Sequence, residues 1–182
     1  MAKELLKREE VLVEHTWNLS DMYETEGDWE AALSEVEELL DEIEVMEDVC
    51  TNSASDLLLL LEKNAQAEEK LSLVYNYAER LFDQDRKNTA HQAMSAKAAT
   101  MHAKLTEKTA FIQPAILALP QETLDNYYKV LPSLEFYRKF VDEILRFREH
   151  SLSRARPSGP YMPGLENISP LASMELPIPT MR

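Results

Sequence analysis

Four histidines and one cysteine are the side chains best suited to metal binding or nucleophilic chemistry: His15, His91, His102, His150 and Cys50. A catalytic zinc site on a helix needs two imidazoles one turn apart, with a glutamate between them as general base. No two of these histidines have that spacing. His91 and His102 return to one helix face, but they would lie roughly 16 Å apart along its axis, too far to share a metal. We therefore interpret His91 and His102 as surface or partly buried helix residues.

Cys50 and the carboxylates offer no better candidate for catalysis. Cys50 is placed by the sequence at a helix end among acidic residues, which raise rather than lower the pKa of a thiol. A chain with three glycines in total can hardly build a glycine-rich phosphate loop. No pair of carboxylates stands out as a general acid and base. We expect no catalytic residue, no metal ligand, no cofactor and no enzymatic activity in this chain.

The charge balance excludes several classes of partner. Asp and Glu number 33 against 19 Lys and Arg, a formal net charge of −14. Such a surface repels phosphate backbones and anionic lipid headgroups, so we expect no nucleic acid and no membrane partner. The charged start lacks the apolar core of a signal peptide. The longest apolar run, residues 57–61, is too short to span a bilayer. With a single cysteine, which suits a reducing compartment, the sequence predicts a cytoplasmic protein.

Glycine and proline divide the chain into two parts. Residues 1–150 contain one glycine and three prolines, whereas residues 151–182 contain two glycines and six prolines. Abundant Ala, Leu, Glu and Lys with little Gly or Pro is typical of helices, and interior prolines prevent a helix in the second part. We predict a helical domain over residues 1–153 and a Pro-rich, disordered tail over residues 154–182.

The first long helix is predicted from apolar residues at steps of three and four: Trp29, Leu33, Val36, Leu40, Ile43 and Met46. Asp28 is the expected N-cap, because its side chain can accept hydrogen bonds from the amides of the first turn. Acidic residues between Glu30 and Glu44 occupy the opposite face. We expect them to form a solvated surface rather than a cation site, since no partner residues are evident elsewhere in the sequence.

Two more long helices follow in the sequence. Residues 56–83 form a helical pattern that Ser53 or Ser55 can cap. An alanine-rich pattern from about residue 89 to residue 113 predicts a third helix, stopped by Pro114 because the residue before a proline disfavours helical geometry. Its many alanines permit the close approach of another helix.

The remaining prolines mark two further helix starts. Pro120 suits the first position of a short helix, and Pro132 opens a last amphipathic helix that runs through "LEFYRKFVDEILRFREH". No segment shows the sustained alternation of apolar and polar residues typical of a strand. The sequence therefore predicts an all-α fold, an antiparallel bundle of long amphipathic helices.

Residues 16–23, "TWNLSDMY", interleave apolar and turn-forming side chains ahead of the first long helix. Asn, Ser and Asp side chains hydrogen-bond nearby backbone amides, and the apolar side chains can pin the segment across the helices. We interpret the segment as a structural clamp that anchors the N-terminus, in preference to a ligand site. The predicted clamp residues are Trp17, Leu19, Ser20, Asp21, Tyr23 and Trp29.

The same segment carries a family resemblance. The stretch "TWNLSDMYETEGDWEAAL" resembles the start of the oligoendopeptidase F family, in which a Trp-Asp/Asn-Leu-Ser-Asp-Ile/Leu-Tyr element precedes a helix with a second Trp. The likeness continues in order through "LLLLLEKNAQAEEKLSLVYNYAERLFDQD", "LPQETLDNYY" and "YRKFVDEILRFREHSLS". It covers about residues 5–153.

The family consists of zinc metallopeptidases that cleave short peptides. The resemblance implies that this chain is the family's N-terminal helical domain, which forms one wall of the peptide-binding cleft. None of the family's zinc ligands, nor its catalytic glutamate, has a counterpart position here. The resemblance ends after Ser153, where the family continues with a Glu-rich helix. We therefore expect a truncated protein, with zinc only in the full-length family and a tail translated out of the ancestral reading frame.

A different class of function stays open beside this one. The chain can also be read as a free-standing acidic helical module that binds a basic or helical partner. If its helices normally pack on a catalytic domain, the contact side should expose more apolar area than a self-sufficient monomer does. The sequence therefore also leaves open self-association or association with a peptidase catalytic domain.

Overall fold

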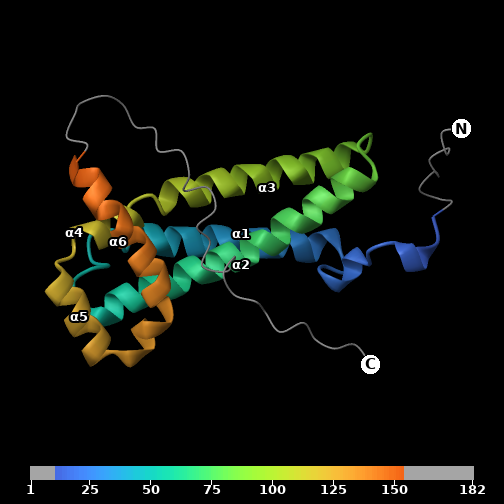
Figure 1. The fold of residues 1–182 in the computed structure, drawn as a ribbon. Coiled ribbons are helices and arrows are strands. Elements are labelled where there is room, and N and C mark those ends of the chain that lie inside the picture. The colour runs from blue at the N-terminus through green and yellow to red at the C-terminus, as the bar shows by residue number, and fades with distance from the viewer. Residues whose placement is uncertain (1–10, 154–182) are drawn as a thin grey trace, which may run out of the picture. The chain divides into compact units, whose positions relative to one another are not determined.

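The structure, a computed structural model, describes residues 11–153, without the side chains of Val13 and of residues 148–153. Within this range the chain contains no strand, which confirms the all-α prediction. The predicted tail, residues 154–182, lies outside the described residues. The elements are η2 (Val13–His15), η3 (Leu19–Asp21), α1 (Glu26–Glu44), α2 (Ala54–Gln84), α3 (Thr89–Lys108), α4 (Ile112–Ala118), α5 (Gln121–Val130), η4 (Pro132–Tyr137) and α6 (Arg138–Ser153) (Figure 1).

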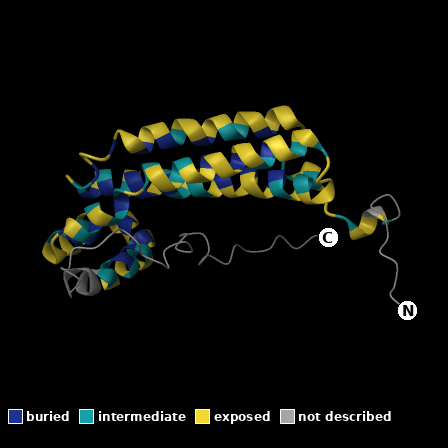
Figure 2. Cartoon of the chain, turned by 90° about the horizontal axis from the view of Figure 1, so that it is seen from above, coloured by how far each residue is buried: buried dark blue, intermediate teal, exposed yellow. Residues whose placement is uncertain are grey.

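The described residues form two compact units. The first combines residues 11–37 with residues 70–104, and the second combines residues 38–69 with residues 105–153. Each unit has its own buried apolar residues, and exposed residues cover the outer faces of the long helices (Figure 2). No helix in the described range has both the length and the apolar character needed to cross a bilayer.

The buried face of α1 follows the predicted apolar series. Trp29, Val36, Leu40 and Ile43 are fully buried, and Met46 just beyond the helix is nearly so. The helix begins earlier than we expected, however, because Thr25 rather than Asp28 is its N-cap. The Thr25 hydroxyl accepts a hydrogen bond from the Asp28 amide at 3.1 Å, and an Asp28 carboxylate oxygen accepts one from the Thr25 amide at 3.0 Å. This reciprocal pair is a capping box, in which Asp28 is the third helical residue.

The junction between α3 and α4 also differs from the prediction. Helix α3 ends at Lys108, and Pro114 lies inside the first turn of α4 rather than stopping α3. Proline fits there because the amides of a first helical turn have no intrahelical acceptor. The alanines of α3 are mostly exposed, and among them Ala98 alone is buried within the described residues. They therefore do not bring a neighbouring helix close along the whole length of α3.

The other helix starts lie close to their predicted positions. Ser53 is the cap of α2, since its hydroxyl accepts a hydrogen bond from the Asp56 amide at 3.1 Å. We predicted that Pro120 is the first residue of a short helix. In the structure Pro120 is the N-cap of α5, and the helix begins one residue later, at Gln121. Pro132 opens the 3-10 helix η4, and α6 continues directly from it at Arg138.

Candidate functional site

The predicted clamp begins as a turn closed by its own polar side chains. The side-chain amide of Asn18 donates to an Asp21 carboxylate oxygen at 2.8 Å, and the Ser20 hydroxyl donates to the Asn18 amide oxygen at 2.8 Å. The Met22 amide donates to the Leu19 carbonyl at 3.0 Å. Asn18, Ser20 and Asp21 are all exposed. Their hydrogen bonds therefore shape the backbone locally and leave the docking of the segment to its apolar residues.

Those apolar residues pack on the core of the first unit. The buried core consists of Trp29, Val74, Tyr77, Ala78, Met94 and Ala98, and Leu19, Met22 and Tyr23 lie half-buried against it. The ring of Tyr23 meets that of Tyr77 edge to face, with centroids 5.2 Å apart and an interplanar angle of 85°. This is a favoured geometry for two aromatic rings. Burial raises the pKa of both tyrosine hydroxyls.

Trp29 occupies the centre of this cluster. Its side chain is fully buried, and its indole Nε1 donates a hydrogen bond to the Val74 carbonyl at 2.9 Å. A buried indole needs such an acceptor, because an unpaired donor in the core costs free energy. The hydrogen bond joins α1 to α2, and the half-buried residues of the turn pack against the same cluster. Leu19 and Tyr23 thus hold the N-terminal segment against the α1–α2 contact.

Trp17 does not take part in this packing. Its side chain is 84% exposed, and Leu12 nearby in the chain is 60% exposed. Our expectation that Trp17 supplies buried apolar area is therefore wrong. The reason is local: the residues that reach the core, Leu19 and Tyr23, follow the turn, whereas Trp17 precedes it.

The acidic face of α1 is exposed but is not simply solvated. In the first unit, Lys97 and Lys104 of α3 pair with Glu30 and Glu37, and Lys70 of α2 pairs with Glu35. The first two pairs share one sequence separation of 67 residues. Because the difference in residue number is the same for both pairs, α1 and α3 run parallel. Each lysine of α3 therefore lies opposite a carboxylate at the same position along α1.

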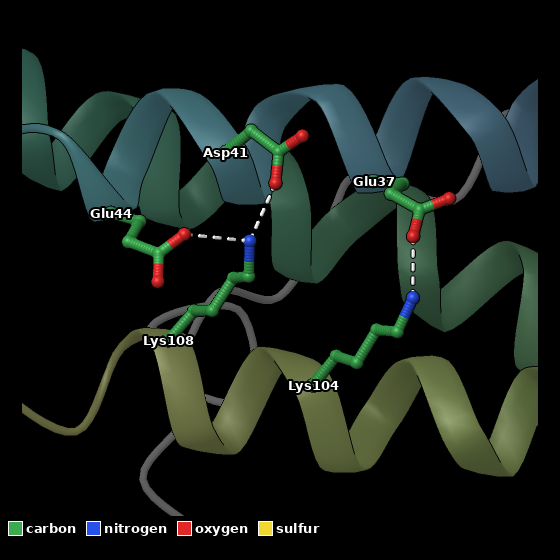
Figure 3. A network of polar contacts seen from close by, with 5 residues as sticks. All are labelled: Glu37, Asp41, Glu44, Lys104 and Lys108. Carbon is green, nitrogen blue, oxygen red and sulfur yellow. Dashed lines mark hydrogen bonds and ion pairs between the residues drawn. The ribbon is translucent and has the colours of Figure 1, made fainter.

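The second unit repeats this arrangement. Lys108 of α3 lies between Asp41 at 2.5 Å and Glu44 at 2.9 Å (Figure 3). Lys63 of α2 pairs with Glu42 in the same unit. Hydrogen bonds from Lys108 to the two carboxylates raise the pKa of its ammonium group. Sequence reasoning missed these partners, because pairing across helices depends on how the helices are aligned. Most acidic residues of α1 therefore form ion pairs with lysines of α2 and α3.

The residues with potential for metal or thiol chemistry are dispersed. His15 is exposed, His91 contacts the side chain of Asn88 at 3.3 Å, and the His102 ring lies 6.1 Å from that of Tyr75. Cys50 is buried, and burial raises the pKa of its thiol. Among residues 11–147, whose side chains are described apart from Val13, no three His, Cys, Asp or Glu side chains are grouped so that they could hold a metal ion.

Comparisons with known proteins agree with the resemblance. A sequence model of the family described as Oligopeptidase F matches residues 116–156. The oligopeptidase PepF of Bacillus subtilis is 29% identical over 152 residues, which is 84% of this chain and 23% of the relative. An oligoendopeptidase F homolog of Lactococcus lactis subsp. lactis is 28% identical over 148 residues, covering 81% of this chain and 25% of the relative.

Solved structures show the same relationship. A crystal structure of oligoendopeptidase-F from Enterococcus faecium superposes with a TM-score of 0.63 at 29% identity, covering 69% of this chain and 24% of the other. A putative peptidase from Chlamydophila abortus superposes with a TM-score of 0.66 at 23% identity over 84% of this chain and 27% of that one, a likeness of fold. The chain is similar to oligoendopeptidase F proteins, and it spans about a quarter of the length of the relatives it matches.

Proposed function

We propose that this chain serves as the N-terminal helical domain of an oligoendopeptidase F-like peptidase, forming one wall of the cleft that encloses a peptide. The observation that carries the proposal is the coverage of the comparisons. More than four fifths of this chain aligns with only about a quarter of each curated relative. The chain thus corresponds to about a quarter of a larger protein.

We propose further that this chain does not hydrolyse peptides by itself and that zinc belongs to the catalytic portion. A catalytic zinc takes three protein ligands and one open position. Among the described residues, no three His, Cys, Asp or Glu side chains are grouped so that they could supply such ligands. The chain's own contribution is then the helical surface on which the catalytic portion and its peptide rest.

Catalysis and metal content are tested on the purified 182-residue chain. We expect no cleavage of a fluorogenic oligopeptide and far less than one zinc per chain by elemental analysis. The B. subtilis relative assayed in parallel provides the positive control. Chelator-sensitive cleavage by the chain alone would contradict the proposal that it is not catalytic.

The domain role is tested separately by complementation. The B. subtilis relative, with the segment that this chain matches deleted, is co-expressed with the tagged chain. We expect the two to co-purify and to cleave the fluorogenic peptide with chelator sensitivity. A relative that stays insoluble, or that fails to co-purify with the chain, contradicts the domain role.

The second function left open by the sequence, a free-standing acidic interaction module, has less support. Such a module would present the acidic face of α1 to a basic partner. Lysines of α2 and α3 already pair with six carboxylates of that face: Glu30, Glu35, Glu37, Asp41, Glu42 and Glu44. A basic partner would have to compete with lysines that are held in place by the fold.

A further inference from the structure

The most exposed large apolar side chain on the described residues is Trp17, and Leu12 lies close to it in the chain. Both belong to the N-terminal segment of the first unit, whose backbone forms short-range hydrogen bonds before and after Trp17. The His15 amide donates to the Leu12 carbonyl at 2.9 Å, and the hydrogen-bonded turn at Asn18 follows Trp17 directly. The fold therefore presents an indole to the outside, between two locally hydrogen-bonded turns.

An exposed tryptophan on an ordered segment has the properties of an interface anchor. Tryptophan buries a large area with only two rotatable side-chain bonds, and it is among the residues that contribute most to protein–protein binding. The other apolar residues of the segment, Leu19, Met22 and Tyr23, are already packed on the core. Trp17 thus has no structural role in the described part of the chain that would account for its size and position.

The charges around Trp17 indicate what kind of partner surface would cover its side chain. Glu14, Asp21 and Glu24 are exposed acidic residues on the same segment, and the whole chain carries a net charge of −14. A second copy of this chain would bring the same acidic residues against Trp17, and like charges in contact weaken association. The complementary surface is therefore an apolar pocket with a lysine or arginine rim and an acceptor for the indole N–H.

We infer that Trp17, together with the exposed Leu12 five residues earlier in the chain, anchors this chain to the remaining portion of an oligoendopeptidase F protein, in a basic-rimmed apolar pocket. This inference rests on the proposed function, since about three quarters of each matched relative lies beyond the segment that the chain covers. It adds the location of the contact and the chemistry of the surface that receives it. The N-terminal turn then has two sides, one packed on Trp29 and one directed to the partner.

The test uses the complementation pair described above, with variants of the full chain. Trp17→Ala should weaken binding to the catalytic portion at least tenfold, and Leu12→Ala should weaken it less. Val45→Ala, which shortens another highly exposed apolar side chain, is the matched control and should leave binding within twofold. All three variants should keep the thermal unfolding midpoint of the parent chain, because the three side chains lie outside the core.

The chain contains two tryptophans, one exposed and one fully buried, so fluorescence reports on the contact directly. The emission of the parent minus that of Trp17→Phe isolates the exposed indole. We expect this difference spectrum to shift to the blue and to lose its quenching by acrylamide when the catalytic portion binds. High salt should slow the association, because it screens the acidic segment from the basic rim.

Each outcome has a defined meaning. Binding that is unaffected by Trp17→Ala overturns the anchor while leaving the proposed domain role intact, and so does equal weakening by Val45→Ala. Failure of the parent chain to bind overturns both the domain role and the anchor. Self-association of the parent that Trp17→Ala abolishes, measured by sedimentation, overturns the assignment of the partner and identifies a second copy in its place.

Discussion

The indole of Trp29 and the backbone carbonyl of Val74 are joined by a buried hydrogen bond of 2.9 Å between residues 45 positions apart. This hydrogen bond thus connects helix α1 to helix α2 within the first unit. Leu19 and Tyr23 of the N-terminal turn pack against the buried cluster that contains Trp29 and Val74. The hydrogen bond and the clamp are therefore parts of one structural feature.

Replacing Trp29 with Phe should destabilise the chain by about 1–3 kcal/mol. The change removes the indole donor and leaves a small cavity where the larger ring was. Urea unfolding followed by circular dichroism measures the loss. The matched control is Trp17→Phe, an identical substitution at an exposed site, which should change the free energy of unfolding by no more than about 0.5 kcal/mol. Equal effects of the two substitutions would contradict the assigned environments.

Leu19→Ala should destabilise the first unit by about 1–2 kcal/mol, because Leu19 is half-buried against the Trp29 cluster and loses part of its apolar contact. Hydrogen exchange should show faster exchange at the amides of Met22 and Tyr23, which donate to the Leu19 carbonyl. Trp17→Ala serves as the comparison and should leave these amides protected. A clamp role for the turn is excluded if Leu19→Ala changes neither stability nor exchange.

Lys104→Gln should lower stability at low salt by a few tenths of a kcal/mol, the usual size for an exposed ion pair. The lysine pairs with Glu37 and also offsets repulsion among the other acids of α1. Both effects are electrostatic, so the difference between variant and parent should shrink as sodium chloride is added. Lys87→Gln, in the loop before α3, is the control. A difference that does not depend on salt would indicate that Lys104 acts through packing of its alkyl chain.

The adjacent residues Tyr127 and Tyr128 should respond oppositely to the loss of their hydroxyl groups. The Tyr127 hydroxyl donates to the Thr51 carbonyl at 2.9 Å, so Tyr127→Phe should cost about 0.5–1.5 kcal/mol. The Tyr128 hydroxyl is buried, and among the described residues no atom pairs with it. Tyr128→Phe removes that unpaired group and should be neutral or stabilising. The free energies of unfolding of the two variants, measured by urea denaturation, test this prediction. A greater loss for Tyr128→Phe than for Tyr127→Phe would contradict it.

Tyr128 also predicts the alkaline limit of stability. Burial raises the pKa of its hydroxyl to about 12, above the ordinary value of 10.0. Above pH 10 this tyrosine ionises in the unfolded chain but stays protonated in the folded chain. The free energy of unfolding is therefore unaffected by this group below pH 10 and falls as pH rises from 10 towards 12. Tyr128→Phe should therefore lose less stability over this interval than the parent chain. Parallel alkaline losses in the two proteins would contradict the burial of this hydroxyl.

The sequence by itself determined the helical class, the apolar face of α1 and the positions of most helix starts. These features depend on residues within a few turns of each other, such as the steps from Trp29 to Val36 and on to Ile43. Family resemblance rested likewise on short motifs in a fixed order. The capping box of α1 could also have been predicted, because Thr25 and Asp28 have the spacing that such boxes require.

Only the tertiary structure decided which residues of each local pattern are buried and which charged residues pair. Trp17 and Trp29 both lie among polar neighbours in the sequence, yet one is exposed and the other is fully buried. The pairing of Lys97 with Glu30, and of Lys108 with Asp41, depends on the height at which α3 lies beside α1. That alignment is set by core packing between helices distant in sequence, and local periodicity contains no information about it.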